Sequence, residues 1–429
     1  ADGPDDGRRR ERGRVLRALA DGALAGASTV NVDNLPPAAV DALVRSESLR
    51  DFGNDRVALR HDLLAEWAVS CLLSDLTVFD QLPLQSPAPA ILARGVELTA
   101  RFAIERSADS TSWQQLLERV SREAVHGSWR RAALLALVRS EAAADALTKA
   151  SESLLANHSR LLRELIRTVK AVDVLPAAQL FAALGVDPAS VPTHLNMPRG
   201  PAWFRLIMWL LALGDRLPAA AIPDVASLYF DWSLSIWGRD PVTPLLLPWV
   251  HRWLSAIEDA RETESSREFR APFTGDLDGA NLSDLEDSLR TTFVSFCDRT
   301  PALAASYLEA VMRRQRNERA VEGILKYRGR LAEAAPAQLA ALTVAALIPP
   351  VDQDGRGRRR GRRRENEPFT WTDSKFIPAS PAQGPFLELL MHAPQHGLAL
   401  IRQLVDHAIA FYSDGQPHGS NAFVVEFAD

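Results

Sequence analysis

The sequence is poor in cysteine, lysine and long apolar runs, and each shortage excludes a class of protein. Its two cysteines, Cys71 and Cys297, are too few for a disulfide scaffold or a cysteine-based zinc site, and they fit a reducing cytosol best. The most hydrophobic stretch, residues 202–213, contains Arg205 and is shorter than the ~20 residues needed to cross a bilayer. The first ten residues are charged and lack the apolar stretch of a secretory signal. We therefore expect a cytoplasmic chain without a membrane span.

The motifs of nucleotide hydrolysis and of common hydrolases are also missing. Only four lysines occur, so almost all positive charge is arginine, and no lysine completes a glycine-rich phosphate loop ending in Gly-Lys-Ser or Gly-Lys-Thr. No strand-like apolar run ends in paired acids for magnesium, and no Gly-x-Ser-x-Gly elbow is present. We expect no catalytic residue in this chain, which alone should not hydrolyse ATP.

A metal site is not expected either. Of nine histidines, His392, His396 and His407 form the nearest group, but Pro394 separates the first two, so a single helix does not present both on one face. No His-Glu-x-x-His motif occurs. We interpret these histidines as solvated side chains.

The apolar content is sufficient for several cores. The chain has 429 residues, 47% of them hydrophobic, which at about 100–200 residues per domain gives two to four domains. A net charge of −5 excludes a globally basic nucleic-acid protein. The sequence starts with Ala-Asp-Gly and stops directly after a strand-like run at 422–427, so we expect it to be part of a longer protein.

Residues 1–80 show the element order of a winged-helix domain. Pro36-Pro37 is well placed to open a helix. Gly53-Asn54-Asp55 has the length and composition of a tight hairpin turn. The predicted elements are helices over 11–24, 38–45 and 62–73, and a hairpin of 49–52 with 56–59. The apolar side chains expected to face inward from the third helix are Leu63, Leu64, Trp67, Cys71 and Leu72.

Residues 81–348 are almost wholly helical in pattern, after a proline-rich linker at 83–89. Apolar residues recur at i, i+3, i+4 and i+7. Successive helix pairs recur at about 35–50 residues, the range of helical-repeat solenoids, but they share no consensus residue. We therefore predict a mainly α protein, with an N-terminal winged-helix module followed by an irregular α-solenoid or HEAT-like helical array. The predicted helices span 90–106, 111–123, 128–140, 158–171, 202–213, 224–237, 245–257, 284–298, 302–316 and 336–347.

Two polar stretches interrupt this pattern. Residues 258–287 are mostly acidic and are interpreted as a surface loop, in which Glu258 and Asp259 provide solubility. Residues 349–368 form an arginine-rich insert, for which two hypotheses stay open: a disordered, solvated segment, or a contact with nucleic acid or an acidic partner. Its seven arginines are Arg356, Arg358, Arg359, Arg360, Arg362, Arg363 and Arg364.

Residues 369–429 form the last predicted region, helical over 384–412 and ending in the strand-like run. Pro385 is well placed to open a helix with Phe386, Leu389 and Leu390 inward. Trp371 and Phe376 are expected to fill a seam between helices, with a ligand groove as the alternative.

The most informative motif lies where the second strand of the hairpin meets the third helix. Here Arg60-His61-Asp62 is followed by Leu63-Leu64 and, one residue later, Glu66-Trp67-Ala68. Asp62 suits an N-cap or first-turn position, because its carboxylate satisfies free backbone donors and complements the helix dipole. His61 would then project from the strand end, where its ring N–H can meet a phosphate oxygen. The alternative is that the triplet serves capping and packing alone.

This junction resembles the end of the winged-helix domain in signal-transducing P-loop NTPases of the STAND class, which includes the NACHT proteins. In that family a His-Asp element contacts the β-phosphate of bound ADP and holds a closed state. The resemblance covers roughly residues 11–75 and implies that His61 senses nucleotide and Asp62 supports it, while Arg60 stands where plant and apoptosome relatives have methionine.

The resemblance also implies a regulatory and sensor role, as in bacterial members that act in antiphage defence. ADP or ATP with magnesium is expected only with an ATPase core preceding this chain, whose absence here is a departure from the family pattern. The expected partners are that core, a protein trigger and, on activation, further copies of the protein; nucleic acid is not expected.

Two rival functions stay open at this point. A winged-helix DNA-binding regulator would read DNA with residues 38–45, which offer one arginine, Arg45, against Asp41. A helical-repeat scaffold for protein interaction would need no nucleotide at all.

Overall fold

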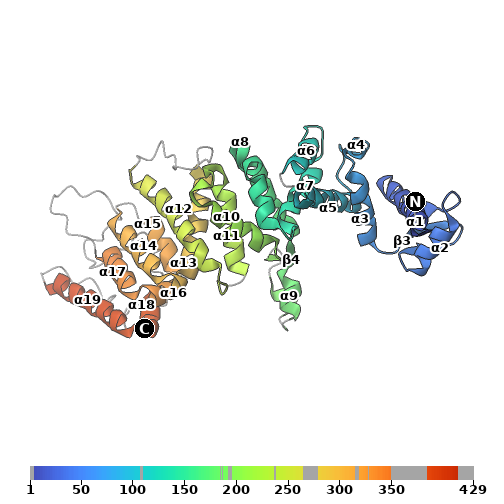
Figure 1. Cartoon of the computed structure of the whole chain (residues 1–429). Helices are drawn as coiled ribbons and strands as arrows, with labels where there is room; N and C mark the ends of the chain where they lie inside the picture. The colour runs from blue at the N-terminus through green and yellow to red at the C-terminus, as the bar shows by residue number, and fades with distance from the viewer. Residues whose placement is uncertain are drawn as a thin grey trace. The chain divides into compact units, whose positions relative to one another are not determined.

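The computed structural model describes residues 4–106, 110–183, 185, 187–191, 196–235, 238–263, 279–314, 318–326, 328–348 and 384–413. These residues are mainly α-helical, which confirms the predicted α class (Figure 1). The chain divides into two compact units, Ala1–Ala221 (unit 1) and Ile222–Asp429 (unit 2), and the boundary falls inside the stretch 81–348 that the sequence groups as one array. Within the described residues, none of the helices combines the length and the apolar character that crossing a membrane requires.

The N-terminal elements of unit 1 combine helices with a small antiparallel sheet of strand order β1-β3-β2. Leu49 pairs with Leu59, and Val30 pairs with Val57. The predicted hairpin is confirmed, and the helix predicted over 62–73 is confirmed at both ends. The elements are α1 (Pro4–Leu24), β1 (Val30–Asn31), α2 (Pro37–Arg45), β2 (Leu49–Asp51), β3 (Arg56–Leu59) and α3 (Asp62–Leu73).

The hairpin turns where the sequence supplies residues that tolerate a left-handed backbone. Gly53, Asn54 and Asp55 have φ angles of 75°, 52° and 59°, a region that glycine, asparagine and aspartate enter at the least cost. The backbone N–H of Gly53 donates a hydrogen bond of 2.8 Å to the Asp51 carboxylate. The turn sets the register of β3 and thereby the position of the junction that follows it.

A small apolar core joins α1 and α2 to the sheet. It is built from side chains at helical spacing on α1 and α2 and from one inward residue on each of β2 and β3. Its buried members are Val15, Leu19, Ala39, Val40, Leu43, Leu49 and Val57.

The remainder of unit 1 is a run of packed helices: α3 packs against α5, α5 against α7, and α7 against α8. The helices predicted over 90–106 and 202–213 are confirmed at both ends. The elements are α4 (Leu76–Phe79), α5 (Ala90–Arg106), α6 (Thr111–Val120), α7 (Gly127–Arg139), α8 (Ala143–Val172), β4 (Val174–Pro176), α9 (Ala177–Ala183), β5 (Asn196–Pro198) and α10 (Ala202–Leu213).

The segment predicted as a linker, residues 83–89, is hydrogen-bonded to α7 and to the residue before it. The carbonyl of Leu84 accepts from the backbone N–H of His126 at 2.7 Å, and the carbonyl of Ser86 accepts from the indole N–H of Trp129 at 2.9 Å. The proline-rich composition therefore marks a bend that is fixed to a neighbouring helix.

Two features of unit 1 differ from the sequence-based expectation. α8 begins at Ala143, well before the predicted residue 158, and its backbone leaves the helical conformation at 156–159. β4 and β5 form an antiparallel pair, with Leu175 opposite Met197, that was not predicted.

Unit 2 consists of helices in its described residues. The helix predicted over 336–347 is confirmed at both ends, and those over 245–257, 284–298 and 302–316 are confirmed with shifted ends. The elements are α11 (Ile222–Ser235), α12 (Thr243–Thr263), α13 (Gly279–Phe296), α14 (Pro301–Arg313), α15 (Glu318–Lys326), α16 (Arg328–Ala334), α17 (Pro336–Leu347), α18 (Phe386–His392) and α19 (Pro394–Ser413).

Several sequence-based predictions lie outside the described residues. These are the arginine-rich insert at 349–368 with Arg356–Arg364, the expected seam residues Trp371 and Phe376, and the strand at 422–427.

Candidate functional site

The Arg60-His61-Asp62 triplet lies at the end of β3 and the start of α3, where the sequence places it. His61 occupies the N-cap position with extended backbone angles (φ −128°, ψ 137°), and its side chain makes no capping hydrogen bond. Its carbonyl accepts the first helical hydrogen bonds from Leu64 and Ala65. Asp62 is the first residue of α3, so its carboxylate is in the first turn, and both the His61 and Asp62 side chains are exposed. The imidazole is therefore presented to solvent and is not used as a cap.

Arg60 is held by a neighbouring turn. Its Nη1 lies 3.2 Å from Oε2 of Glu47, which sits between α2 and β2 with a left-handed φ of 60°. Its backbone N–H donates to the carbonyl of Ser48 at 3.0 Å. Both ion-pair partners are well exposed, so this contact adds little stability, but it attaches the junction to the turn after α2.

The orientation of α3 corrects the predicted inward face. Leu63 is 65% exposed and Trp67 49% exposed, and Cys71 is exposed too, although all three were expected to face the core. Four of the five buried residues of α3 are small or β-branched, namely Ala65, Ala68, Val69 and Ser70, and the fifth is Leu73. The cause is the close approach of α5: a Cβ added at Gly95 would lie only 2.5 Å from Cγ1 of Val69. The side of α3 near Val69 therefore packs against α5, because the short side chains there allow the two helices to come close.

Leu63, Trp67 and Cys71 lie at i, i+4 and i+8 and so share one side of the helix; we call this the outer face of α3. Its N-terminal end carries His61 and Asp62. Two large apolar side chains, Leu63 and Trp67, are thus exposed along this face, while Glu66 and Ser70 lie on another side of the helix. Partial burial raises the pKa of the Cys71 thiol against the opposing effect of Arg106, which disfavours the nucleophilic thiolate at neutral pH.

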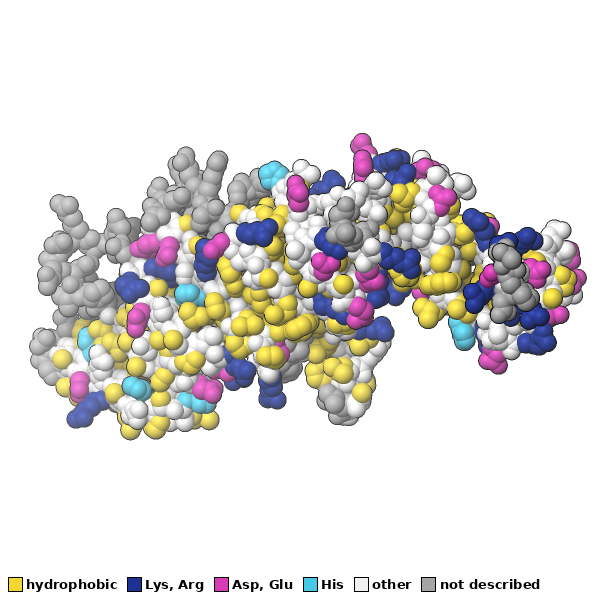
Figure 2. Space-filling model, in the orientation of Figure 1, with side chains coloured by type: hydrophobic (Ala, Val, Ile, Leu, Met, Phe, Trp, Pro, Cys, Tyr) yellow, Lys and Arg dark blue, Asp and Glu magenta, His cyan; other side chains and the backbone are white. Residues whose placement is uncertain are grey.

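On the face shown in Figure 2, basic and acidic side chains are interspersed over the N-terminal elements. On α2, the Nε of Arg45 donates to the backbone carbonyl of Asp41 at 3.2 Å. The one arginine of the helix that would read DNA is thus engaged within that helix.

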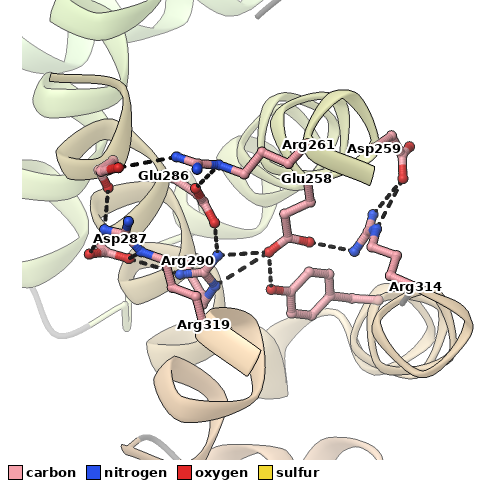
Figure 3. Close-up of polar contacts among 10 residues, drawn as sticks. Glu258, Asp259, Arg261, Glu286, Asp287, Arg290, Arg314 and Arg319 are labelled. Carbon is pink, nitrogen blue, oxygen red and sulfur yellow. Dashed lines mark hydrogen bonds and ion pairs between the residues drawn. The ribbon is translucent and has the colours of Figure 1, made fainter. Parts of the chain in front are cut away.

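A second cluster, in unit 2, was missed by sequence reasoning. The predicted surface loop at 258–287 is wrong for its described residues: α12 extends to Thr263, and α13 begins at Gly279. Glu258 is only 5% exposed and lies among buried ionic groups, so its predicted role in solubility is wrong as well (Figure 3). We call the set Glu258, Glu286, Arg290, Tyr307 and Arg314 the α12–α14 cluster.

Glu258 is the centre of this cluster. Its Oε1 accepts hydrogen bonds from Nη2 of Arg290 and from the hydroxyl of Tyr307, both at 2.9 Å. Its Oε2 accepts from Nη1 of Arg314 at 2.5 Å. Burial raises the pKa of Glu258, although both arginines act to lower it. One carboxylate from α12 therefore joins α13 to α14 and to the residue that follows α14.

The rim of the cluster adds exposed partners. Asp287 pairs with Nη1 of Arg290 at 2.9 Å and with Arg319 of α15. Asp259 pairs with Nη2 of Arg314 at 2.9 Å (Figure 3). Burial raises the pKa of Asp287, but Arg319 and Arg290 outweigh it and lower the pKa overall. Positive and negative groups balance, which is the composition of a structural clamp between helices and not of a site awaiting a charged ligand.

A groove of about 520 Å³ lies where α13, α16 and α18 meet. Its arginines are already paired: Nε of Arg328 donates to Oε1 of Glu388 at 2.8 Å, and Nη1 of Arg330 lies 3.3 Å from the carboxylate of Asp298. An anionic ligand would have to displace these carboxylates. Within the described residues, no group of three or more histidine, cysteine, aspartate or glutamate side chains is arranged to hold a metal ion.

No protein-family profile matches the chain, and no curated protein is significantly similar to it. The functional conclusion therefore depends on the geometry of the junction at Arg60–Asp62 and on the outer face of α3.

Proposed function

We propose that this chain is the regulatory and sensor portion of a nucleotide-dependent signalling switch of the STAND class, acting with an ATPase core outside it. In this proposal the elements from α1 to α3 form a winged-helix module, and the helices that follow form a HEAT-like sensor array. His61 would contact the diphosphate of ADP held by the core, with Asp62 supporting it. The array would recognise a protein trigger, and antiphage defence is the setting that the resemblance suggests.

The observation that carries the proposal is the exposure of His61 at the end of an uncovered apolar helix face. Its side chain makes no capping hydrogen bond, so the ring N–H can donate to a phosphate oxygen. It stands at the N-terminus of the 12-residue helix α3, whose dipole favours an anion there. Leu63 and Trp67 offer the apolar contact area that a docked domain needs. Of the groups that such a nucleotide switch requires, this chain would supply the histidine and the docking face.

The mechanism follows from a two-state arrangement of domains. With ADP in the core, the His61 contact and the apolar contacts of α3 would favour a closed state, because both exist only when the surfaces meet. A trigger that binds the array better in the open state would shift the population, and nucleotide exchange followed by oligomerisation would complete activation. ATP itself would be handled by the core, since this chain has no lysine in a phosphate loop.

The direct test measures nucleotide retained by the full-length protein. Loss of a hydrogen bond to a charged phosphate should weaken ADP retention by about 10- to 100-fold in the His61→Ala variant. The exposed His392, in unit 2, provides the matched control, and His392→Ala should retain ADP as the wild type does. Equal ADP content in wild type and His61→Ala would refute the proposal.

A second test uses Cys71 as a built-in probe of docking. Cys71 is exposed on the outer face of α3, whereas Cys297 is fully buried and burial raises its pKa to about 12. A maleimide should therefore label Cys71 in preference to Cys297 in this chain alone. In the ADP-bound full-length protein the same peptide should be protected, and protection should be lost with His61→Ala. Equal labelling of Cys71 in this chain alone and in the ADP-bound full-length protein would favour the helical scaffold. In a separate experiment, salt-dependent retention of residues 1–80 on duplex DNA would favour the DNA-binding regulator.

A further inference from the structure

α3 belongs to the helical packing of unit 1 as much as to the N-terminal module. It packs against α5, where Gly95 allows a close approach to Val69. The hydroxyl of Thr99 on α5 donates to the backbone carbonyl of Ser70 on α3 at 3.1 Å. The outer face of α3 is thus on one side of a helix whose other side is fixed to the following helices.

A line of alternating charges runs from α3 through these helices. Glu66 of α3 pairs with Arg94 of α5 at 3.5 Å, and Arg94 also pairs with Glu97 one turn further on. Oε2 of Glu97 accepts from Nη1 of Arg139 at the end of α7 at 2.6 Å. Nη2 of Arg139 in turn donates to Oδ1 of Asp173, directly after α8, at 2.6 Å. We call these five residues the ionic ladder.

The three members of the ladder beyond Arg94 are buried or half-buried. The Glu97 side chain is 5% exposed and the Asp173 side chain 12% exposed. Burial lowers the pKa of Arg139, but Asp173 and Glu97 outweigh it and raise the pKa overall, so the guanidinium stays charged. Glu97 bridges two arginines and Arg139 bridges two carboxylates. Removing either one takes an ion-pair partner from two neighbours at once, so the contacts of the ladder are coupled.

The far end of the ladder is also anchored. The backbone carbonyl of Asp173 accepts from the indole N–H of Trp203 on α10 and from the backbone N–H of Arg199, both at 2.8 Å. Asp173 therefore connects the ladder to the start of β4, the end of β5 and the first turn of α10.

We propose that the ionic ladder couples the outer face of α3 to the α8–α10 region, so that a displacement at Asp173 is transmitted to α3. The contacts from Glu97 through Arg139 to Asp173 are directional hydrogen bonds between charged groups, which have few alternative positions, and the ion pair of Glu66 with Arg94 joins them to α3. The role of this coupling in signalling rests on the proposed function, because the ladder would transmit the binding of a trigger at the array to the face of α3 that docks on the ATPase core. The physical coupling itself is a property of this chain alone.

Hydrogen exchange in the isolated chain tests the coupling without nucleotide. Asp173→Asn, at the far end of the ladder, should speed amide exchange in residues 62–73 by at least about tenfold, the factor that corresponds to ~1.4 kcal/mol. Arg139→Gln should do the same, and Arg139→Lys, which keeps the charge, should do so less. Circular dichroism spectra and melting temperatures establish that each variant is folded.

The matched control is another ion pair on the same helix. Arg130 of α7 donates to Glu164 of α8 through Nε at 2.7 Å and Nη2 at 3.1 Å, and it is buried to a similar extent as Arg139, but it is not part of the ladder. Arg130→Gln should speed exchange in α7 and α8 and leave α3 unchanged. The coupling is refuted if Asp173→Asn leaves α3 unchanged, or if both kinds of variant accelerate α3 equally. Retention of ADP is a separate readout, so failure of the proposed function and failure of the coupling are distinguishable.

Discussion

Replacing Glu258 by glutamine should destabilise unit 2 far more than replacing its neighbour Asp259 by asparagine. Both residues end in carboxylates that pair with Arg314, but Glu258 is 5% exposed, whereas the side chain of Asp259 is 68% exposed. The comparison separates burial from the mere presence of an ion pair.

The magnitude follows from what glutamine leaves unpaired. Glu258 accepts from Arg290, Arg314 and Tyr307, whereas glutamine has one acceptor oxygen and would point its NH₂ group at a guanidinium. Removing one partner of a buried ion pair costs about 3–5 kcal/mol. In a domain of 150–250 residues, each kcal/mol lowers Tm by about 2–4 °C, so the expected loss is about 6–20 °C. Asp259→Asn should cost at most about 1 kcal/mol, as exposed pairs do.

Thermal and urea unfolding at pH 7, followed by circular dichroism, give the two losses. Hydrogen exchange in α12, α13 and α14 shows that the change is located in unit 2. Tyr307→Phe removes one donor without leaving a buried charge, so it should cost about 1 kcal/mol and combine non-additively with Glu258→Gln, because both changes affect one carboxylate. A loss below about 1 kcal/mol for Glu258→Gln, or equal losses at the two neighbouring positions, would refute the reasoning.

Two further outcomes are expected. Burial and then Arg314 lower the pKa of His251 from its ordinary value of 6.5, against the opposing effect of Asp259. As the pH drops below about 6.5, the unfolded chain takes up this proton before the folded chain does, so the free energy of unfolding falls. His251→Phe, which suits the ring contact with Phe293, should therefore flatten the pH dependence of the free energy of urea unfolding between about pH 7 and 5. An unchanged slope would contradict this. Gly95→Ala should destabilise the protein by about 1–3 kcal/mol, because the added Cβ collides with Val69. The control Gly13→Ala in α1, where a Cβ meets nothing within 4 Å, should stabilise it by up to about 1 kcal/mol. Melting temperatures that move in the same direction for both variants would argue against the close α3–α5 contact.

Much of the secondary structure could be predicted because its signals are local. The hairpin needs only the three residues Gly53 to Asp55 between two extended runs, and α3, α5, α10 and α17 carry their apolar spacing and helix boundaries within the predicted stretch. β4 and β5 were missed since each has three residues, too few for a period of two, and α9 separates them.

The exposed face of α3 could not be chosen from the helix alone. Because apolar residues occupy most of the helix surface, the choice depends on Gly95, more than twenty residues away, which makes the side near Val69 the one that packs. The α12–α14 cluster had a partial signal: Glu258 continues the i, i+4 series of Val250 and Leu254, so it stands at a core position. Its partners lie 32 to 56 residues away, and only the fold shows that they meet.

The exposed apolar residues of α3 have a consequence for the protein in the cell. Leu63 and Trp67, left in water, resemble the apolar segments by which chaperones and proteases recognise unfinished proteins. A copy of this region that lacks its covering domain would accordingly be removed from the cell sooner than a complete one. In the proposed switch, the two side chains that favour docking would in this way keep the cellular amounts of sensor and core equal.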